Sequence, residues 1–224
     1  MARFFFGLPA LALVAGAALA ACVSQTGQPP RNTGMGIDAF GHTQLSEERS
    51  TAAPDRLAHL QRLIASLRSS LPKYRSIERA EADGFRPEGP DVPVGALKHF
   101  VSYGNVAVNW QHLDPDRPMA LLYRRTQSGY ELAGVMFTAP ITSTMDELDQ
   151  RVPLAYGHWH SHRNICQPKD STATLTPEQR HEFGFSGSIN TKAACDAAGG
   201  VFMDNVFGWM VHVYPFEDDP AKQF

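Results

Sequence analysis

The chain has 224 residues, of which 43% are hydrophobic and 19% charged, and its formal net charge is −3. A chain of this length is large enough to bury a core, and the size suits one domain. The charge provides no basic stripe of the kind that contacts phosphates, so we expect no nucleic acid partner.

The N-terminal segment is organised like a bacterial export signal. Residues 1–21 contain one charged residue, Arg3, followed by an apolar stretch with a small-residue end, which is typical of a secretory signal peptide. Residues 19–22, Leu-Ala-Ala-Cys, match a lipobox, and no aspartate follows the cysteine. We therefore predict a lipoprotein on the periplasmic side of the outer membrane, anchored through lipidated Cys22. The alternative is cleavage after Ala20, which would release a soluble periplasmic protein.

The cysteine count fits this prediction. If Cys22 carries lipid, Cys166 and Cys195 remain, and in an oxidising compartment we expect them to form a disulfide that stabilises the fold by about 3–4 kcal/mol. Residues 22–53 are rich in Gly, Gln, Ser, Thr and Pro, and we expect a flexible tether there. The single globular domain is then expected to span residues 54–224.

Helices are expected first in this domain. Apolar residues recur at helical spacing from Asp55 to Leu71, with Pro54 before this segment and Pro72 after it, and this pattern predicts an amphipathic helix. A shorter helix is expected over residues 74–83. Two later short helices are expected to begin with capping boxes, at residues 144–147 and 176–179, and a third is expected over residues 191–198, ended by Gly199 and Gly200.

From residue 97 onward the segments are short, β-branched or aromatic, and separated by turns, as is typical of strands. The predicted strands are residues 97–103, 105–111, 119–125, 130–138, 155–162 and 206–214. The expected fold class is α+β, with N-terminal helices followed by a mainly antiparallel sheet that could curl into a barrel and carries short helical insertions.

Three histidines at two-residue spacing, His158, His160 and His162, are the main functional signal. On a strand this spacing points the imidazoles to one side, and neutral imidazole is a ligand for zinc and copper. His158 and His162 would lie about 13 Å apart on a regular strand, too far to share an ion. A metal site is expected to use one adjacent pair of the triplet. The alternative is that these are surface or hydrogen-bonded core histidines.

Two further histidines are candidates to complete such a site. His212 lies in the apolar last strand and is its only ionisable residue before Tyr214, so it must either bind an ion or find a hydrogen-bond partner. His99 alternates with Lys98 in the first strand and is expected to point inward. The remaining histidines are expected at the surface: His42, His59, His112 and His181.

Methionines offer a second type of ligand. Met210 shares a strand face with His212, and Met136 is central in another predicted strand. A mixed histidine and methionine site would suit copper(I), although strand methionines are more often part of the core.

Catalytic motifs are missing from the sequence: it contains no H-E-x-x-H, no G-x-S-x-G and no phosphate-binding glycine loop. A cupin-like enzyme also carries an H-x-H pair and a distant histidine, but a carboxylate ligand usually follows the pair soon after. Here Arg-Asn-Ile follows at residues 163–165. The sequence therefore favours a binding protein over an enzyme.

Four segments, residues 98–101, 113–123, 132–137 and 208–216, resemble a group of predicted bacterial secreted proteins and lipoproteins of unassigned function. The resemblance covers most of residues 74–217. It implies a histidine early in the sheet and another in the segment of the triplet, which match His99 and His158, and it implies no activity.

Three functional hypotheses follow. The first is a lipid-anchored periplasmic protein that binds a transition metal ion, copper slightly favoured over zinc, for sequestration or delivery. Its ligands would be His158, His160 and His212, with His99 or His162 assisting. The second is a metal-dependent enzyme with a cupin-like histidine site. The third is an envelope interaction lipoprotein without a metal.

Overall fold

The computed structural model describes residues 41–89, 91–170 and 175–224. The predicted signal peptide, Cys22 and the predicted tether up to residue 40 lie outside these residues. Within them, no helix combines the length and the apolar character needed to cross a membrane.

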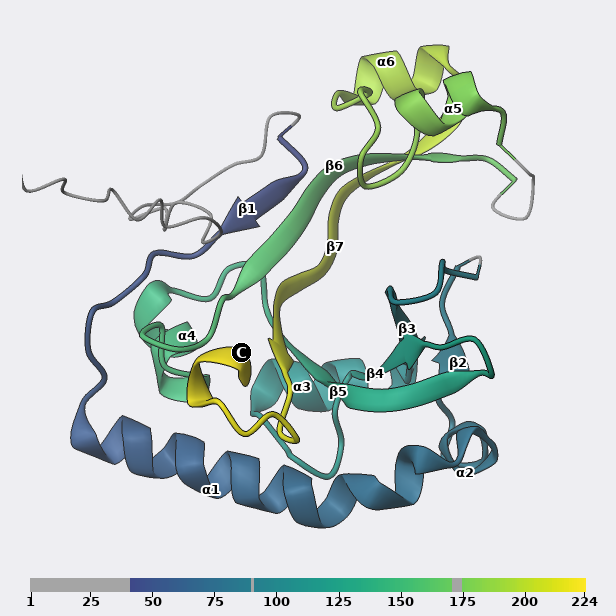
Figure 1. The fold of residues 1–224 in the computed structure, drawn as a ribbon. Coiled ribbons are helices and arrows are strands. Elements are labelled where there is room, and N and C mark those ends of the chain that lie inside the picture. The colour runs from purple at the N-terminus through teal and green to yellow at the C-terminus, as the bar shows by residue number, and fades with distance from the viewer. Residues whose placement is uncertain (1–40, 90, 171–174) are drawn as a thin grey trace, which may run out of the picture. The chain divides into compact units, whose positions relative to one another are not determined.

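Helices and strands are interspersed along the chain after a short first strand (Figure 1). The helices are α1 (Pro54–Ser70), α2 (Ile77–Ala82), α3 (Val106–Gln111), α4 (Met145–Arg151), α5 (Pro177–Glu182) and α6 (Lys192–Ala197), with short 3-10 helices η1 (Leu71–Arg75), η2 (Tyr103–Asn105) and η3 (Pro220–Lys222). The strands are β1 (Thr43–Leu45), β2 (Arg86–Pro87), β3 (Leu97–Val101), β4 (Ala120–Arg125), β5 (Tyr130–Ala139), β6 (His160–Pro168) and β7 (Gly200–Val213).

In the described part of the chain these strands form one antiparallel sheet of seven, in the order β1-β6-β7-β5-β4-β3-β2. The predicted α+β class is confirmed. The sheet ends in β1 and β2 and does not close into a barrel. It is strongly twisted, since the lower part of β7 runs nearly upright in Figure 1 while β5 runs nearly horizontally.

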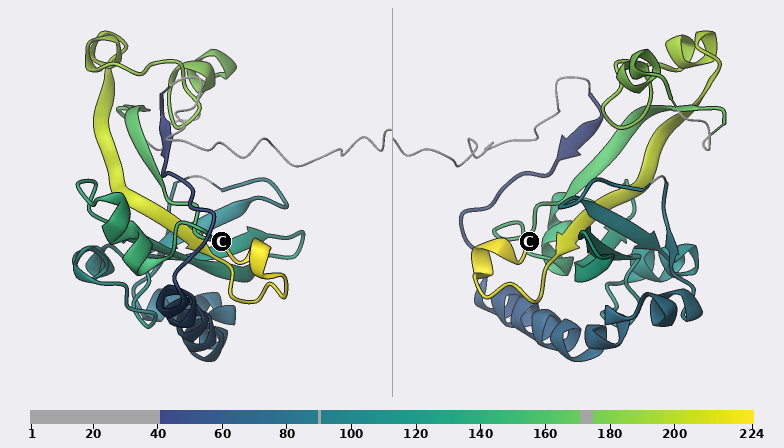
Figure 2. Two further views of the ribbon diagram at one scale, coloured as in Figure 1. Left: turned by 90° about the vertical axis from the view of Figure 1, so that its left-hand side faces the viewer. Right: turned by 45° about the vertical axis from the view of Figure 1, so that its right-hand side comes forward.

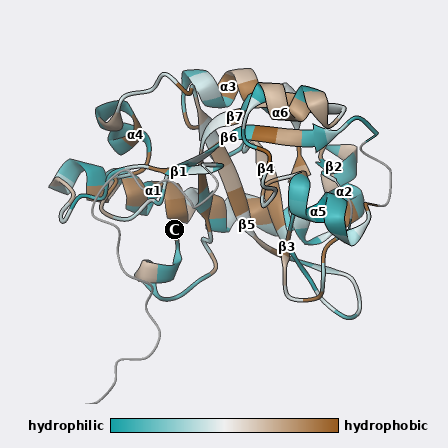
Figure 3. Ribbon diagram, turned by 90° about the horizontal axis from the view of Figure 1, so that it is seen from above, coloured by the Kyte–Doolittle hydropathy of each residue, from teal (hydrophilic) through white to brown (hydrophobic). Residues whose placement is uncertain are grey.

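One face of the sheet packs against α1, which Figure 2 shows at the opposite end of the fold from α5 and α6. The helix buries residues at positions i, i+3, i+4 and i+7, the spacing of one helical face: Leu60, Leu63, Ile64 and Leu67. They belong to the same core as the inward residues of the central strands, whose apolar character on β5 is visible in Figure 3. These strand residues include Phe100, Leu121, Val135, Phe137 and Val211.

The opposite face carries a second apolar cluster, which we call the methionine cluster. Its buried members are Val101, Met119, Ala120, Leu122, Met136 and Met210. In an antiparallel ladder, directly opposed residues lie on the same face. His99 is opposed to Leu122, His212 to Met136 and His160 to Met210. The three histidines therefore share this face with the methionine cluster.

A bulge bends β7 beside these histidines. Phe207 and Gly208 have φ values of 61° and 81°, in the left-handed region. The register with β6 shifts at this point, because Ser161 is opposed to Trp209 while His162 is opposed to Val206. Such bulges increase twist and redirect neighbouring side chains.

One predicted strand, residues 105–111, is wrong: this segment forms η2 and α3. Its alternating valines imitate a strand, but buried Asn109 explains the helix. The Asn109 side chain donates hydrogen bonds to the carbonyls of Asn105 and Arg117 and accepts one from the backbone N–H of Thr138. These contacts dock the helix on β5.

The predicted strand 155–162 is also displaced, because β6 begins only at His160. The backbone N–H groups of Tyr156 and Gly157 both donate to the carbonyl of Pro153. A Cβ at Gly157 would lie 2.5 Å from Cγ1 of Val152, so a side chain at this position would displace Val152. His158 is consequently in the loop before the strand.

The end of the predicted tether belongs to the domain. Thr43–Leu45 pairs with β6. His42 is fully buried, with Nε2 2.7 Å from the carbonyl oxygen of Gly187, so the expectation that it is a surface histidine is wrong. The sequence did not predict this strand, because β1 has only three residues and lies at the edge of the sheet, where polar residues are common.

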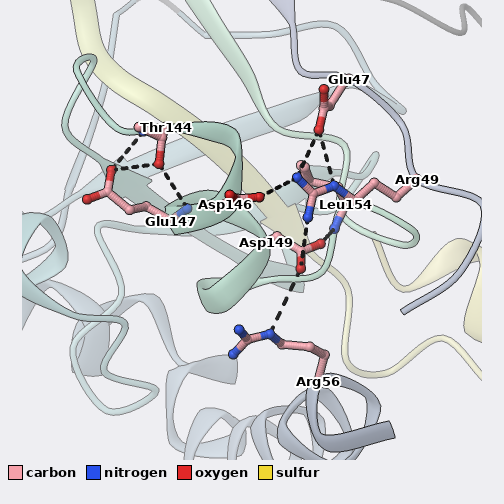
Figure 4. Close-up of polar contacts among 8 residues, drawn as sticks. All are labelled: Glu47, Arg49, Arg56, Thr144, Asp146, Glu147, Asp149 and Leu154. Carbon is pink, nitrogen blue, oxygen red and sulfur yellow. Dashed lines mark hydrogen bonds and ion pairs between the residues drawn. The ribbon is translucent and has the colours of Figure 1, made fainter. Parts of the chain in front are cut away.

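Arg49 fastens the segment after β1 to α4 (Figure 4). Its guanidinium lies 3.0 Å from Glu47, 2.6 Å from Asp146 and 3.4 Å from Asp149. Its backbone N–H donates to the carbonyl of Leu154 at 3.3 Å. Single exposed ion pairs contribute little, but this group fixes the path of the chain beside the loop that leads into β6.

The predicted disulfide is present between Cys166 of β6 and Cys195 of α6, which are 29 positions apart. Replacing both cysteines by alanine is expected to lower the free energy of unfolding by about 3–4 kcal/mol, because the unfolded chain regains the entropy of a loop of this size. Urea unfolding of the variant and the parent would measure this loss. Equal midpoints would show that the crosslink does not stabilise the domain.

Candidate metal centre

Four imidazoles lie in a row across the methionine-cluster face of the sheet. They come from three strands: His99 from β3, His212 from β7, and His160 and His162 from β6. Consecutive ring centroids are 5.2 Å apart for His99 and His212, 5.1 Å for His212 and His160, and 5.3 Å for His160 and His162. The structure thus brings together four of the five histidines that the sequence nominates.

The closest approach in the row is between His99 and His212, whose Nε2 atoms are 3.2 Å apart. Strands β4 and β5 separate the two strands that carry them, a gap of about 14 Å on a flat sheet. The twist of the sheet shortens this path, and Gly134 of β5, which is opposed to Leu122 of β4, carries no side chain. A Cβ at Gly134 would lie 2.2 Å from the carbonyl oxygen of Val213.

A separation of 3.2 Å between two Nε2 atoms fits two arrangements. In the first, one neutral ring donates an N–H hydrogen bond to the other. In the second, both nitrogens bind one ion, since two ligands at about 2.0–2.1 Å from a tetrahedral zinc are about 3.3–3.4 Å apart. The pair therefore has the spacing of two ligands of one metal ion.

The second ring nitrogens of His160 and His212 have hydrogen-bond partners. Nδ1 of His160 lies 3.3 Å from the carbonyl oxygen of His158, to which it can donate. Nδ1 of His212 lies 3.4 Å from the hydroxyl of Tyr214. In metal sites, such outer contacts to the second nitrogen orient the ring and fix its tautomer. In both rings they favour Nε2 as the ligand atom.

His162 forms the outer end of the row. Its Nδ1 lies 3.3 Å from the hydroxyl oxygen of Thr43 in β1. Its ring is 4.8 Å from that of Phe185, which belongs to the segment between α5 and α6 and is 46% exposed. His162 thus connects the buried imidazoles with the surface of the domain.

Burial keeps the inner imidazoles neutral. Burial, together with a smaller effect of neighbouring imidazoles, lowers the pKa of His99 to about 4 and the pKa of His212 to about 3. Burial also lowers the pKa of His160. Neutral imidazole is the form that binds a metal ion.

These shifts predict a loss of stability in acid. Unfolded histidines take up protons near pH 6.5, whereas folded His99 and His212 do so only near pH 4 and 3. The unfolded state therefore binds more protons in between, and the free energy of unfolding should fall as the pH drops from 6.5 to 4. Each histidine contributes at most about 1.4 kcal/mol per pH unit.

Urea unfolding of the metal-free protein between pH 8 and 4 would measure this dependence. The variant His99→Gln/His212→Gln lacks both titrating groups and should show a shallower slope. Identical slopes would contradict the assignment of acid sensitivity to these two rings.

His158 does not belong to the row. Its side chain is 64% exposed, and its Nδ1 lies 4.0 Å from Oε1 of Glu48. The triplet offered two adjacent pairs, His158 with His160 and His160 with His162. The rings of the second pair are in contact. Among the histidines expected at the surface, His112 and His181 are exposed.

As the side chains stand in residues 41–89, 91–170 and 175–224, no group of three or more His, Cys, Asp or Glu residues is arranged to hold a metal ion. The pair of His99 and His212 has ligand spacing, and His160 packs edge-on against His212 with an interplanar angle of 79°. A rotation of the His160 ring is therefore needed for a three-ligand site.

The sequence did not identify Tyr214 and Thr43 as partners of the row. Tyr214 follows His212 by two residues, so strand alternation could have placed both on one face. Nothing in the sequence pairs Thr43 with His162, because that contact depends on the β1–β6 register.

Comparisons of the chain with protein-family models, with curated proteins and with solved structures found no match. The resemblance to secreted proteins and lipoproteins of unassigned function therefore stays a prediction, and the candidate site is interpreted from its own geometry.

Proposed function

We propose that the domain binds one transition metal ion through His99, His160 and His212, with copper favoured slightly over zinc. The observation that carries the proposal is the 3.2 Å separation of the Nε2 atoms of His99 and His212. The role we propose is metal sequestration or delivery by a lipid-anchored protein of the periplasm, in keeping with the lipobox at Cys22.

Two ligands are held in position by the fold, and the third requires a small movement. His160 lies in ring contact with His212 and on a neighbouring strand. Turning its Nε2 toward the pair involves side-chain torsions alone, and rotamer changes of this kind are common when a ligand binds. His162 is next in the row and could relay the ion to or from the surface.

Two cavities of the domain lie away from the row of histidines. One, of about 700 Å³, is lined mainly by α1 and C-terminal residues, and a second, of about 420 Å³, mainly by residues of α1, α3 and α4. None of the four histidines of the row lines either cavity.

Metal stoichiometry tests the proposal. The protein would be loaded with zinc(II) or, under reducing conditions, with copper(I), desalted and analysed for metal. We expect about one equivalent bound per chain and its loss in the variant His99→Ala/His212→Ala. The matched control is His112→Ala/His158→Ala, which removes two exposed imidazoles and should retain the metal. Absence of stoichiometric metal in the parent, or equal loading of both variants, would refute the proposal.

A further inference from the structure

Two buried methionines lie directly opposite two of the proposed ligands. Met136 of β5 is opposed to His212 of β7, and Met210 of β7 is opposed to His160 of β6. Met136 is 2% exposed and Met210 3% exposed. Opposed residues have Cβ atoms about 4.5–5.5 Å apart on the same face, so both methionine side chains leave the sheet beside these imidazoles.

Tyr214 links the two groups of side chains. Its ring packs against the methionine cluster, while its hydroxyl lies 3.4 Å from Nδ1 of His212. The methionine cluster and the row of histidines are therefore continuous. Methionine has three rotatable side-chain bonds and a polarisable sulfur, and can adjust its position without moving the backbone.

The charges around the histidines bear on whether a monovalent or a divalent ion binds more favourably. The groups that perturb the pKa of His99, His160 and His212 are other imidazoles, one backbone carbonyl and Lys98, without a carboxylate. Moving an ion into a partly buried site has a desolvation cost that rises with the square of its charge. Among the described residues, none of the groups that perturb these three imidazoles is an anion that would offset that cost. A singly charged ion is therefore favoured.

We propose that Met136 and Met210 supply thioether ligands that make the histidine site selective for copper(I). Thioether sulfur is a soft ligand that suits copper(I), whereas zinc takes imidazole, thiolate and carboxylate ligands. This inference rests on the proposed metal-binding function and adds the oxidation state of the metal and two ligand residues to it.

The test is a pair of chelator competition titrations, one with copper(I) under anaerobic reducing conditions and one with zinc(II). The variant Met136→Leu/Met210→Leu keeps the volume and apolar character of the core, a type of exchange that cores tolerate well. Its copper(I) affinity should fall at least about tenfold, the range seen when metal sites lose a supporting group, with zinc affinity unchanged. The matched control is Met119→Leu, which lies in the same cluster but is not opposed to a histidine of the row; both affinities should stay at the parent value.

The outcomes separate the two proposals. If the parent binds copper(I) through His212 and the double methionine variant binds it equally well, the methionine inference is overturned and the histidine site stands. If the parent binds neither metal, both proposals fail. Should the double variant not fold, X-ray absorption of the copper(I)-loaded parent decides: a sulfur scatterer supports the inference, and nitrogen alone overturns it.

Discussion

Replacing His212 by alanine should lower the affinity for copper(I) or zinc(II) by more than about 100-fold. His212 is in ring contact with both His99 and His160, so its loss separates the other two ligands. Removing an outer-shell partner alone typically lowers metal affinity by about 10–100-fold. The loss of the central ligand should exceed that range.

Tyr214→Phe is the matched comparison, since it deletes only the hydroxyl beside Nδ1 of His212. Its effect should lie within the outer-shell range and below that of His212→Ala. Competition titrations would give both affinities, and far-UV circular dichroism would verify that the variants fold. A His212→Ala variant that binds metal as tightly as the parent would remove His212 from the site.

Gly208→Ala is expected to have the largest effect on stability among single substitutions at the bulge. A Cβ at this position would lie 2.2 Å from the carbonyl oxygen of Ala139, and its φ of 81° is unfavourable for alanine. The left-handed conformation alone costs about 1–2 kcal/mol, and the clash forces β5 and β7 apart. We expect a loss of about 3 kcal/mol or more in the free energy of unfolding.

Gly199→Ala separates the clash from the backbone strain. Gly199 has a similar φ of 72° but no heavy atom within 4 Å of a built Cβ. Its substitution should cost only the conformational part, about 1–2 kcal/mol. Urea unfolding would measure both variants. Equal losses would show that the close approach of Gly208 to Ala139 does not constrain the sheet.

The sequence predicted the elements whose signals are local. The spacing of leucines defined α1, and the expected threonine capping boxes are present at α4 and α5. The α+β class and the disulfide were also predicted. Each of these depends on a short stretch of sequence or on the number of cysteines left to pair.

The predictions that were wrong concern features that depend on contacts between distant segments. The segment of α3 was predicted to be a strand. The contacts of Asn109 with Thr138 of β5 and with the carbonyl of Arg117 are not visible in the sequence. The segment of β1 was predicted to be part of the tether, because the strand forms only by pairing with the distant β6. His158 was expected as a ligand, but the turn at Gly157 delays the start of β6 and leaves it exposed.

The sequence predicted which histidines form the row, but it did not predict the contact between His99 and His212. Alternation predicted that His99 points inward, the apolar last strand predicted that His212 is buried, and the triplet supplied His160 and His162. No signal in the sequence brings His99 of β3 against His212 of β7 across two intervening strands. That contact depends on the strand order and the twist of the whole sheet.

Nitrogen NMR of the histidine rings tests the metal site most directly. In the protein with and without zinc(II), the Nε2 resonances of His99, His160 and His212 should shift on metal addition, while Nδ1 of His160 and His212 keeps its proton. His112 and His158 should remain unchanged. If saturating metal leaves the Nε2 resonances of His99 and His212 unmoved, or moves those of His158 instead, the row of buried imidazoles is a hydrogen-bonded core and not a metal centre.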